Sequence, residues 1–286
     1  MLYTRKTKII CTLGPATDDE AVLEKLMLSG MNVARFNFSH DTHTGHKERF
    51  ARFVKIRDRL GLPVASMLDT KGPEIRIGRL KNGSIELKRG ASFTLTTRSL
   101  EGDETIASVS YPDLPKDLAI RKTVLLDDGL IELCVESIEG TDIVCRVINS
   151  GTLSNNKGIN VPGTRLTMPC ISEKDRSDII FGIENGFDFI AASFTRNADD
   201  ILAIRKILEE YDCHTIKIIA KIENADGVAN LEDILRVADG IMVARGDMGV
   251  EIPLEEVPVL QKKDDSNGIQ KRETGDHGYA DARIHD

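Results

Sequence analysis

The chain has 286 residues, a length that suggests about two domains of about 100–200 residues each. Apolar residues make up 41% and charged residues 29%, and no run approaches the ~18 apolar residues of a membrane span, so the composition predicts a soluble globular protein without a membrane partner. With 38 basic and 46 acidic residues the net charge is −8, which argues against a general binder of nucleic acid. A local basic site for a phosphorylated small molecule stays compatible with this charge.

The five cysteines are widely spaced and form no Cys-x-x-Cys pair, so the sequence predicts neither a disulfide framework nor a zinc site. They are most simply interpreted as small buried apolar groups. Near the amino terminus, basic residues precede an apolar stretch at residues 9–13 that is too short for the apolar region of a signal peptide. The default expectation is therefore a cytoplasmic protein.

Short β-branched runs alternate with helical patterns in the first part of the chain, which is typical of βαβ units and a parallel sheet. The pattern Thr17-x-x-Glu20 predicts a capping box at the start of a helix that Gly30 ends. A second helix is predicted over residues 43–60. Strands are predicted over residues 8–13, 31–38 and 63–68.

A different rhythm begins at Pro73. Short strands follow one another without long helices, and Asn82-Gly83, Asp128-Gly129 and Glu139-Gly140 are hairpin turn signals. The segment predicts an inserted antiparallel domain, an all-β barrel over residues 73–165. Its strands are predicted over residues 84–87, 92–96, 123–126, 131–138 and 143–148.

The βα alternation then resumes. Ser172-x-x-Asp175 predicts a capping box, and Gly186 ends the helix that it opens. Strands are predicted over residues 189–193, 217–222 and 240–244, and helices over 197–210, 225–237 and from about Pro253 onward.

About six βα repeats of one sheet, interrupted by one insertion, favour an α/β fold of the (β/α)₈ TIM barrel type, truncated after about six strands. The pattern alone leaves a doubly wound sheet open. The predicted divisions are residues 1–72 and 166–263 for the barrel, 73–165 for the inserted β-barrel lid domain and 264–286 for a non-native tail.

In a (β/α)₈ barrel the active site lies at the carboxyl ends of the strands, and four of these ends are rich in polar and charged residues. Alternation places Lys221 and Glu223 on one side of their strand, and Asp247 follows the next strand. Two carboxylates with water and substrate oxygens are a typical Mg²⁺ environment. With Arg35 and Lys221 beside the cation, the site would suit phosphoryl transfer.

Each of these residues also has a simpler interpretation as a solvated turn residue. His40, His43 and His46 have a spacing that resembles metal ligands, yet they lie where a helix begins and are more often exposed. The sequence contains neither a P-loop nor a Gly-x-Gly-x-x-Gly fingerprint, so a nucleotide would be held in another way.

Five ordered segments at the strand ends resemble the pyruvate kinase family, over residues 1 to about 263. They are KIICTLGP at 8–15, ARFNFSH at 34–40, LDTKGPEIR at 68–76, KIEN at 221–224 and MVARGDMGVE at 242–251. The resemblance implies glycolytic phosphoryl transfer from phosphoenolpyruvate to ADP, giving pyruvate and ATP, with Mg²⁺ and K⁺ and a homotetramer for the full-length family.

The resemblance also implies roles for individual residues. Asn37, Ser39, Asp69 and Thr70 would hold K⁺, and Glu223 and Asp247 would hold Mg²⁺. Lys221 would be the catalytic residue that neutralises the transferring phosphoryl group and the enolate oxygen. The backbone N–H groups of Gly246 and Asp247 would bind the substrate carboxylate, Arg35 and Arg76 would contact phosphates, and Lys157 would reach the nucleotide when the inserted domain closes as a lid.

After Lys263 the resemblance stops, and residues 264–286 contain few large apolar side chains. Codons can be chosen for this segment so that a shift of the reading frame by one base changes the translated sequence to MIQMAFKRGKPV and then ITATQMLESM. These shifted sequences resemble the next motif of the family. The hypothesis is a frameshifted, truncated pyruvate kinase that is poorly soluble, not tetrameric and itself nearly inactive. Two alternatives stay open: a non-catalytic fragment that retains nucleotide and cation binding, and a Mg²⁺-dependent barrel lyase acting on phosphoenolpyruvate or pyruvate.

Overall fold

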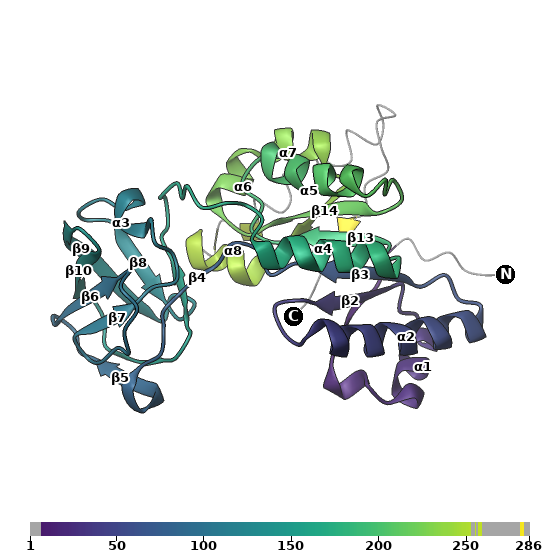
Figure 1. The fold of residues 1–286 in the computed structure, drawn as a ribbon, viewed down its shortest axis with the longest axis horizontal. Helices are drawn as coiled ribbons and strands as arrows, with labels where there is room; N and C mark the ends of the chain where they lie inside the picture. Colours follow the sequence, from purple (N-terminus) through teal and green to yellow (C-terminus); the bar gives the residue numbers. More distant parts are fainter. Residues whose placement is uncertain (1–6, 253–254, 256, 259–280, 283–286) are drawn as a thin grey trace. The chain divides into compact units, whose positions relative to one another are not determined.

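The computed structural model describes residues 7–252, 255, 257–258 and 281–282, which form two compact units (Figure 1). The first takes in the chain up to Gly72, Cys170–Arg245 and the short strand near the end of the chain. The second takes in Pro73–Pro169 and residues 246–252. The chain therefore leaves the first unit for an insertion and then returns to it.

A seven-stranded sheet forms the centre of the first unit, with the order β1-β2-β3-β13-β14-β15-β16 and parallel pairing throughout. From β1 to β15 the strand order follows the chain order, as in a (β/α)₈ barrel, whereas a doubly wound sheet reverses direction at a central strand. The predicted α/β barrel-type fold is thereby confirmed. The strands are β1 (Ile10–Leu13), β2 (Val33–Asn37), β3 (Ala65–Asp69), β13 (Phe189–Ala192), β14 (Lys217–Ile222), β15 (Gly240–Val243) and β16 (Asp281–Ala282).

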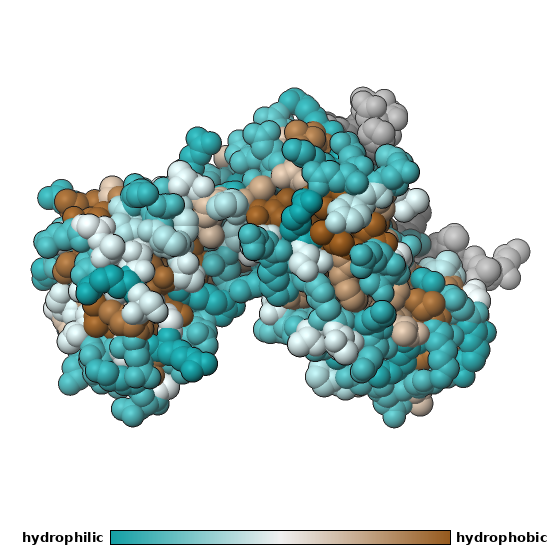
Figure 2. All heavy atoms as spheres, in the orientation of Figure 1, coloured by the Kyte–Doolittle hydropathy of each residue, from teal (hydrophilic) through white to brown (hydrophobic). Residues whose placement is uncertain are grey.

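Helices follow the strands of this unit. They are α1 (Glu20–Leu28), α2 (His43–Leu60), α4 (Glu173–Asn185), α5 (Ala198–Glu210), α6 (Ala225–Ala229) and α7 (Leu231–Val237), and α8 (Arg245–Glu251) follows β15. Ion pairs join α1 to α2, Lys55 to Glu20 at 2.8 Å and Arg59 to Glu24 at 2.6 Å. The surface over these two helices is largely hydrophilic in Figure 2. No helix among the described residues is long and apolar enough to cross a membrane.

Helix starts follow side-chain capping, and one predicted cap is wrong. Ser172 and Asp175 form the predicted capping box of α4, and Gly186 ends that helix in the left-handed region. At α1, however, the cap is Asp19, whose carboxylate accepts from the N–H groups of Ala21 and Val22. Thr17 instead belongs to a 3₁₀ turn, Pro15–Thr17, because its side chain bonds with Gly14.

The predicted helix over residues 225–237 is two helices. Asn230, with φ −101°, separates α6 from α7, and its side-chain amide donates to the carbonyl oxygen of Arg196 at 2.9 Å. The predicted start near Pro253 lies outside the described residues, whereas α8 ends at Glu251. Of the predicted tail, the structure describes only β16, which pairs with β15.

Alternate residues of the sheet fill two apolar regions. One face carries Met67, Ala191, Ile219 and Met242. The other face carries Phe36, which packs with α2 and with Phe187 through ring contacts of 5.3–5.9 Å between centroids. Because side chains two residues apart share a face, the polar residues that follow Met67, Ala191 and Ile219 point the same way as these apolar ones.

Two carboxylates bridge neighbouring strands at the amino-terminal edge of the sheet. Asp188, just before β13, accepts from the N–H of Ser66 at 2.7 Å and from its hydroxyl at 2.8 Å. Asp239, just before β15, accepts from the N–H of Ile218 at 2.9 Å and from Arg205 at 3.0 Å. Each carboxylate therefore ties the start of one strand to its neighbour.

The second unit is a mixed β domain with a core of its own. Its larger sheet contains β4 (Ile75–Arg76), β12 (Gly158–Asn160), β8 (Thr123–Leu126), β9 (Ile131–Glu139), β10 (Asp142–Val147), β6 (Ser92–Thr96) and β7 (Ile106–Ser108), in that order. A smaller sheet pairs β5 (Ser84–Leu87) with β11 (Gly151–Ser154), and a short helix, α3 (Leu114–Asp117), joins β7 to β8. The pairing is not wholly antiparallel, because β6 and β7 run parallel.

Two of the three predicted hairpins of this unit are confirmed. Asp128-Gly129 joins the antiparallel strands β8 and β9, and Glu139-Gly140 joins β9 and β10. Asn82-Gly83 lies instead in a 3₁₀ turn before β5, because β5 pairs with the distant β11 rather than with its predecessor. Both residues have positive φ, 59° and 81°, which explains why a turn dipeptide stands there.

Phe36→Ala should lower the free energy of unfolding by about 3–5 kcal/mol, because Phe36 is fully buried and its removal leaves a cavity among three other phenylalanine rings. Urea unfolding followed by circular dichroism measures the change. Leu202→Ala, at a position on α5 that is 45% exposed, is the control and should change stability little. Equal losses in the two variants would contradict this account of the core.

Candidate functional site

The predicted site residues of the first unit lie at the carboxyl edge of the parallel sheet. Arg35 is in β2, Asp69 ends β3 and Lys221 is in β14. Met67 precedes Asp69 by two residues, and Ile219 precedes Lys221 by two, so the charged residues stand directly above the apolar face. The alternation of strand residues thus brings these side chains together.

Asp69 is the centre of the contacts in this cluster. One of its carboxylate oxygens lies 2.5 Å from Nε of Arg35. The other lies 3.2 Å from Nζ of Lys221 and 3.1 Å from Oγ of Ser193. The side chain is only 1% exposed, so its charge depends on these partners rather than on water.

Lys221 is buried among acceptors. Its ammonium lies 2.8 Å from Oε1 of Glu223 and donates to Oγ of Ser193 at 2.9 Å. Burial by itself would lower the pKa of this ammonium, but the carboxylates of Asp69 and Glu223 outweigh burial and raise the pKa above its ordinary value. Lys221 is therefore a permanent cation at physiological pH.

Glu223 is a buried carboxylate with a backbone partner. Its Oε2 accepts from the N–H of Phe194 at 2.6 Å, while Oε1 faces Lys221. Two carboxylates and two cations, Arg35 and Lys221, thus balance one another in the first unit. Hard oxygen atoms next to a charge-neutral cluster are compatible with an added divalent cation.

The four residues expected to hold K⁺ share oxygen chemistry and lie at adjacent strand ends. Asn37 and Asp69 are register partners in β2 and β3. Ser39 follows β2 in the chain, and its N–H donates to Oδ1 of Asn37 at 3.0 Å. Thr70 follows β3 and donates from its N–H to the carbonyl oxygen of Ala191 at 3.0 Å. Amide, hydroxyl and carboxylate oxygens are the ligand types that suit a hard monovalent cation, so the chemistry of these four residues is compatible with K⁺.

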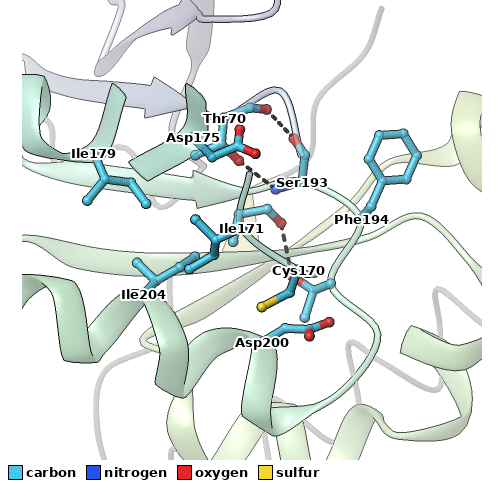
Figure 3. Close-up of a pocket in the computed structure, with 11 residues that line it drawn as sticks. Thr70, Cys170, Ile171, Asp175, Ile179, Ser193, Phe194, Asp200 and Ile204 are labelled. Atoms are coloured by element: carbon cyan, nitrogen blue, oxygen red, sulfur yellow. Dashed lines mark hydrogen bonds between the residues drawn. The ribbon is translucent and has the colours of Figure 1, made fainter. Parts of the chain in front are cut away.

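Gly72 allows the loop after β3 to pass close to β13. Its φ is +72°, and a Cβ at this position would lie 2.9 Å from Cβ of Ser193. The carboxylate of Asp175 accepts from the Gly72 N–H at 3.0 Å and so fixes the loop to the start of α4. Figure 3 shows Ser193 beside Thr70 at a small hollow that is partly open to solvent, with the Phe194 ring turned away from the isoleucines.

In the second unit, the two predicted phosphate contacts already have partners. Arg76 lies 2.6 Å from Glu74 and donates to the carbonyl oxygen of Asn156. Lys157 lies 2.8 Å from Asp127, and this hydrogen bond raises the pKa of the Lys157 ammonium. Both side chains are partly exposed and can be reached by a ligand.

Gly246 and Asp247 lie in α8 and belong to the compact unit of the inserted domain. The expected pairing of Asp247 with Glu223 therefore stays a prediction. Within the part of the chain that the structure describes, no group of three or more histidine, cysteine or acidic side chains is placed to hold a metal ion.

The histidine trio is not a metal site among the described residues. His43 bonds with Asp178 at 2.7 Å. His46 is buried rather than exposed: it stacks on Phe38 with ring centroids 3.9 Å apart, and its ring contacts the carbonyl oxygen of His40. Burial lowers the pKa of His46, so this ring is a neutral packing group.

The expectation of buried cysteines is confirmed only for Cys145, whose pKa burial raises to about 12. Cys11, Cys134, Cys170 and Cys213 are partly exposed.

Ser193 and Phe194 are site residues that the sequence analysis missed. The polar and charged motifs that predict the site follow four other strands, and the end of β13 carries no such motif. Its position in the chain could have identified Ser193, because it lies two residues after Ala191, which faces the apolar interior, and side chains two residues apart share a face.

A parallel α/β sheet with two cations and two carboxylates paired at its carboxyl edge defines an α/β protein of the barrel type with a charged cluster where such barrels carry their active sites. Comparison with known proteins makes this class more specific. The model of the pyruvate kinase barrel domain matches residues 4–271, and so extends beyond Lys263. The chain belongs to the pyruvate kinase family.

Individual relatives agree with this assignment. A pyruvate kinase of Geobacillus stearothermophilus is 53% identical over 260 residues, covering 90% of this chain and 44% of the relative. One of Clostridium acetobutylicum is 49% identical over 259 residues, covering 90% of this chain and 55% of the relative. The crystal structure of a pyruvate kinase from Cryptosporidium parvum has a TM-score of 0.88 and 42% identity, covering 96% of this chain and 57% of that one. The chain thus spans about half the length of the curated relatives it matches.

Lys221→Met should destabilise the first unit by about 3–5 kcal/mol, because it leaves two buried carboxylates without this cation. The folded-state pKa of Lys221 is raised, so the difference between wild type and variant is fully present below the ordinary lysine pKa of 10.5 and is lost as pH rises through the raised value. Urea unfolding from about pH 8 upward measures it. A difference that grows with alkalinity would contradict the ion pairing.

Asp127→Asn should lower the pKa of Lys157 toward its ordinary value and so increase the neutral amine fraction about severalfold at fixed alkaline pH. Competitive acetylation of Lys157, followed by mass spectrometry, measures this fraction. Asp103→Asn is a matched control, because Asp103 pairs with Lys81 at 3.1 Å in the same unit. Faster acetylation of Lys157 in both variants would point to general loosening of the domain instead.

Proposed function

We propose that the chain carries the phosphoryl-transfer site of a pyruvate kinase, which converts phosphoenolpyruvate and ADP to pyruvate and ATP. The observation that carries this proposal is the cluster of buried Lys221, Glu223 and Asp69 with half-buried Arg35 at the carboxyl edge of the sheet, in a chain of this family. The substrates bear several negative charges, and buried cations stabilise such charges more strongly than exposed ones do.

Lys221 would act on the reacting atoms. As the phosphoryl group leaves the enol oxygen of phosphoenolpyruvate for an oxygen of the terminal phosphate of ADP, negative charge spreads over the transferring group and over the enolate that remains. A permanently charged ammonium, already oriented by three acceptors, stabilises that charge without reorganising. Arg35 would hold a phosphate from the neighbouring strand.

Metal ions would complete the site. Mg²⁺ would be held by Glu223 and Asp247, and K⁺ by Asn37, Ser39, Asp69 and Thr70. When bound, these ions would neutralise phosphate charge and help to align the two substrates. The backbone N–H groups of Gly246 and Asp247 would bind the carboxylate of phosphoenolpyruvate.

The inserted domain, in this proposal, contributes nucleotide contacts. Arg76 and Lys157 would bind the phosphates of ADP in exchange for their present carboxylate partners. A protein of this activity would work in glycolysis in the cytoplasm, and the family's homotetramer is the expected assembly of a full-length chain.

The test is binding and turnover with the full chain in Mg²⁺ and K⁺. Calorimetry should detect phosphoenolpyruvate binding, and Lys221→Met should weaken it at least about tenfold, because one charged contact is lost. Lys217→Met is the matched control, since Lys217 is exposed at the opposite end of the same strand and should leave affinity unchanged. Chelating Mg²⁺ should remove most of the binding.

The outcomes separate the candidate functions. Pyruvate formation from phosphoenolpyruvate and ADP supports catalysis by this chain, whereas binding without turnover supports a non-catalytic fragment. A reaction on phosphoenolpyruvate or pyruvate that needs neither ADP nor K⁺ supports the lyase. No binding of phosphoenolpyruvate at any metal concentration would overturn the proposed function.

A further inference from the structure

Ser193 meets the ammonium of Lys221 at the turn after β13. Its hydroxyl oxygen lies 2.9 Å from Nζ of Lys221 and 2.6 Å from the carbonyl oxygen of Thr70. An ammonium can only donate, so the hydroxyl accepts from Lys221, and its one proton has two acceptors within reach, the nearer carbonyl oxygen of Thr70 and Oδ1 of Asp69 at 3.1 Å. Ser193 is 8% exposed, and water has little access to replace either bond.

The ammonium has three protons, and three acceptors surround it. Oδ1 of Asp69 lies at 3.2 Å, Oε1 of Glu223 at 2.8 Å and Oγ of Ser193 at 2.9 Å. Ser193 is the neutral acceptor among these three. It therefore fixes the direction of the ammonium without cancelling any of its charge.

The next residue holds the other side of the cluster. Phe194 has φ +55°, a left-handed conformation that is rare for a bulky residue and persists only where neighbouring contacts enforce it. Its N–H donates to Oε2 of Glu223 at 2.6 Å. This N–H thereby holds the carboxylate of Glu223 against the turn after β13.

We propose that Ser193 is a positioning residue for the ammonium of Lys221, and that the Phe194 N–H positions the carboxylate of Glu223 beside it. The single turn that follows β13 then orients both the ammonium and the carboxylate. The hydrogen bond from Ser193 to Thr70 connects this turn to the end of β3. The catalytic meaning of this placement rests on the proposed function, whereas the placement itself can be tested without substrate.

The experiment observes the Lys221 ammonium directly in the full chain. In ¹H–¹⁵N spectra at neutral pH, a buried and hydrogen-bonded lysine ammonium exchanges its protons slowly enough to be seen, and Lys221→Met assigns the signal by its loss. Ser193→Ala should accelerate proton exchange at Lys221 at least about tenfold, because a hydrogen bond to a charged group is lost. Ser193→Thr keeps the hydroxyl and should restore slow exchange.

Ser66→Ala is the matched control. Ser66 is another buried serine of the same unit, but its hydroxyl bonds with Asp188 at the opposite edge of the sheet. It should lower stability without changing exchange at Lys221. Slow exchange at Lys221 in a folded Ser193→Ala variant would overturn the proposal, as would equal acceleration by Ser66→Ala. If Ser193→Ala does not fold, slow exchange in Ser193→Thr supports the proposal and fast exchange in that folded variant contradicts it.

Activity is a separate readout. If the chain turns over phosphoenolpyruvate, Ser193→Ala should reduce kcat about tenfold with little change in KM. The contacts with the substrate remain in this variant, and only the orientation of the Lys221 ammonium is lost. If no variant binds or converts phosphoenolpyruvate, the proposed function fails, while the exchange rates still decide the role of Ser193.

Discussion

The site depends on one buried carboxylate, that of Asp69. Its side chain is 1% exposed and contacts Arg35 from β2, Lys221 from β14 and Ser193 from the end of β13. A buried charge without partners costs several kcal/mol, so the folded state requires all of these strands in their observed order. The interaction that stabilises the edge of the sheet is therefore also the one that places the chemical groups.

Strand register explains how these contacts arise together. Asp69 is paired with Asn37 on one side and with Ala191 on the other, and Ala191 is paired with Ile219. A slip of one residue in any of these pairs would send the charged side chains to the helix-covered face. The apolar residues of the interior thus set which side chains reach the site, because Met67, Ala191 and Ile219 each lie two residues before a polar one.

Sequence reasoning found the parts of the site that local pattern encodes. Arg35, Lys221 and Glu223 follow from strand ends and alternation. Ser193 did not, because its role depends on Thr70 and Lys221, which are distant in sequence. The same reason explains the turn at Asn82. Its dipeptide is a turn signal, but β5 pairs with β11, where the register partner of Ser84 is the distant Ser154. The predicted cap of α1 was wrong for a different reason. Thr17 and Asp19 are both residue types that cap helices well, and Thr17 is used in the preceding 3₁₀ turn, which leaves Asp19 as the cap.

Every basic side chain predicted to contact an anion already holds a carboxylate. Arg35 pairs with Asp69 at 2.5 Å, Lys221 with Glu223 at 2.8 Å, Arg76 with Glu74 at 2.6 Å and Lys157 with Asp127 at 2.8 Å. Anion binding at these residues, as proposed, would therefore be an exchange of partners. A monoanion gains little from such an exchange, because the carboxylate that it displaces is left without a cation. A polyphosphate that arrives with a divalent metal leaves no charge unpaired, since the metal can take the released carboxylate. If these residues bind anions as proposed, the charge pairing of the free protein would favour metal-bound phosphates over simple anions.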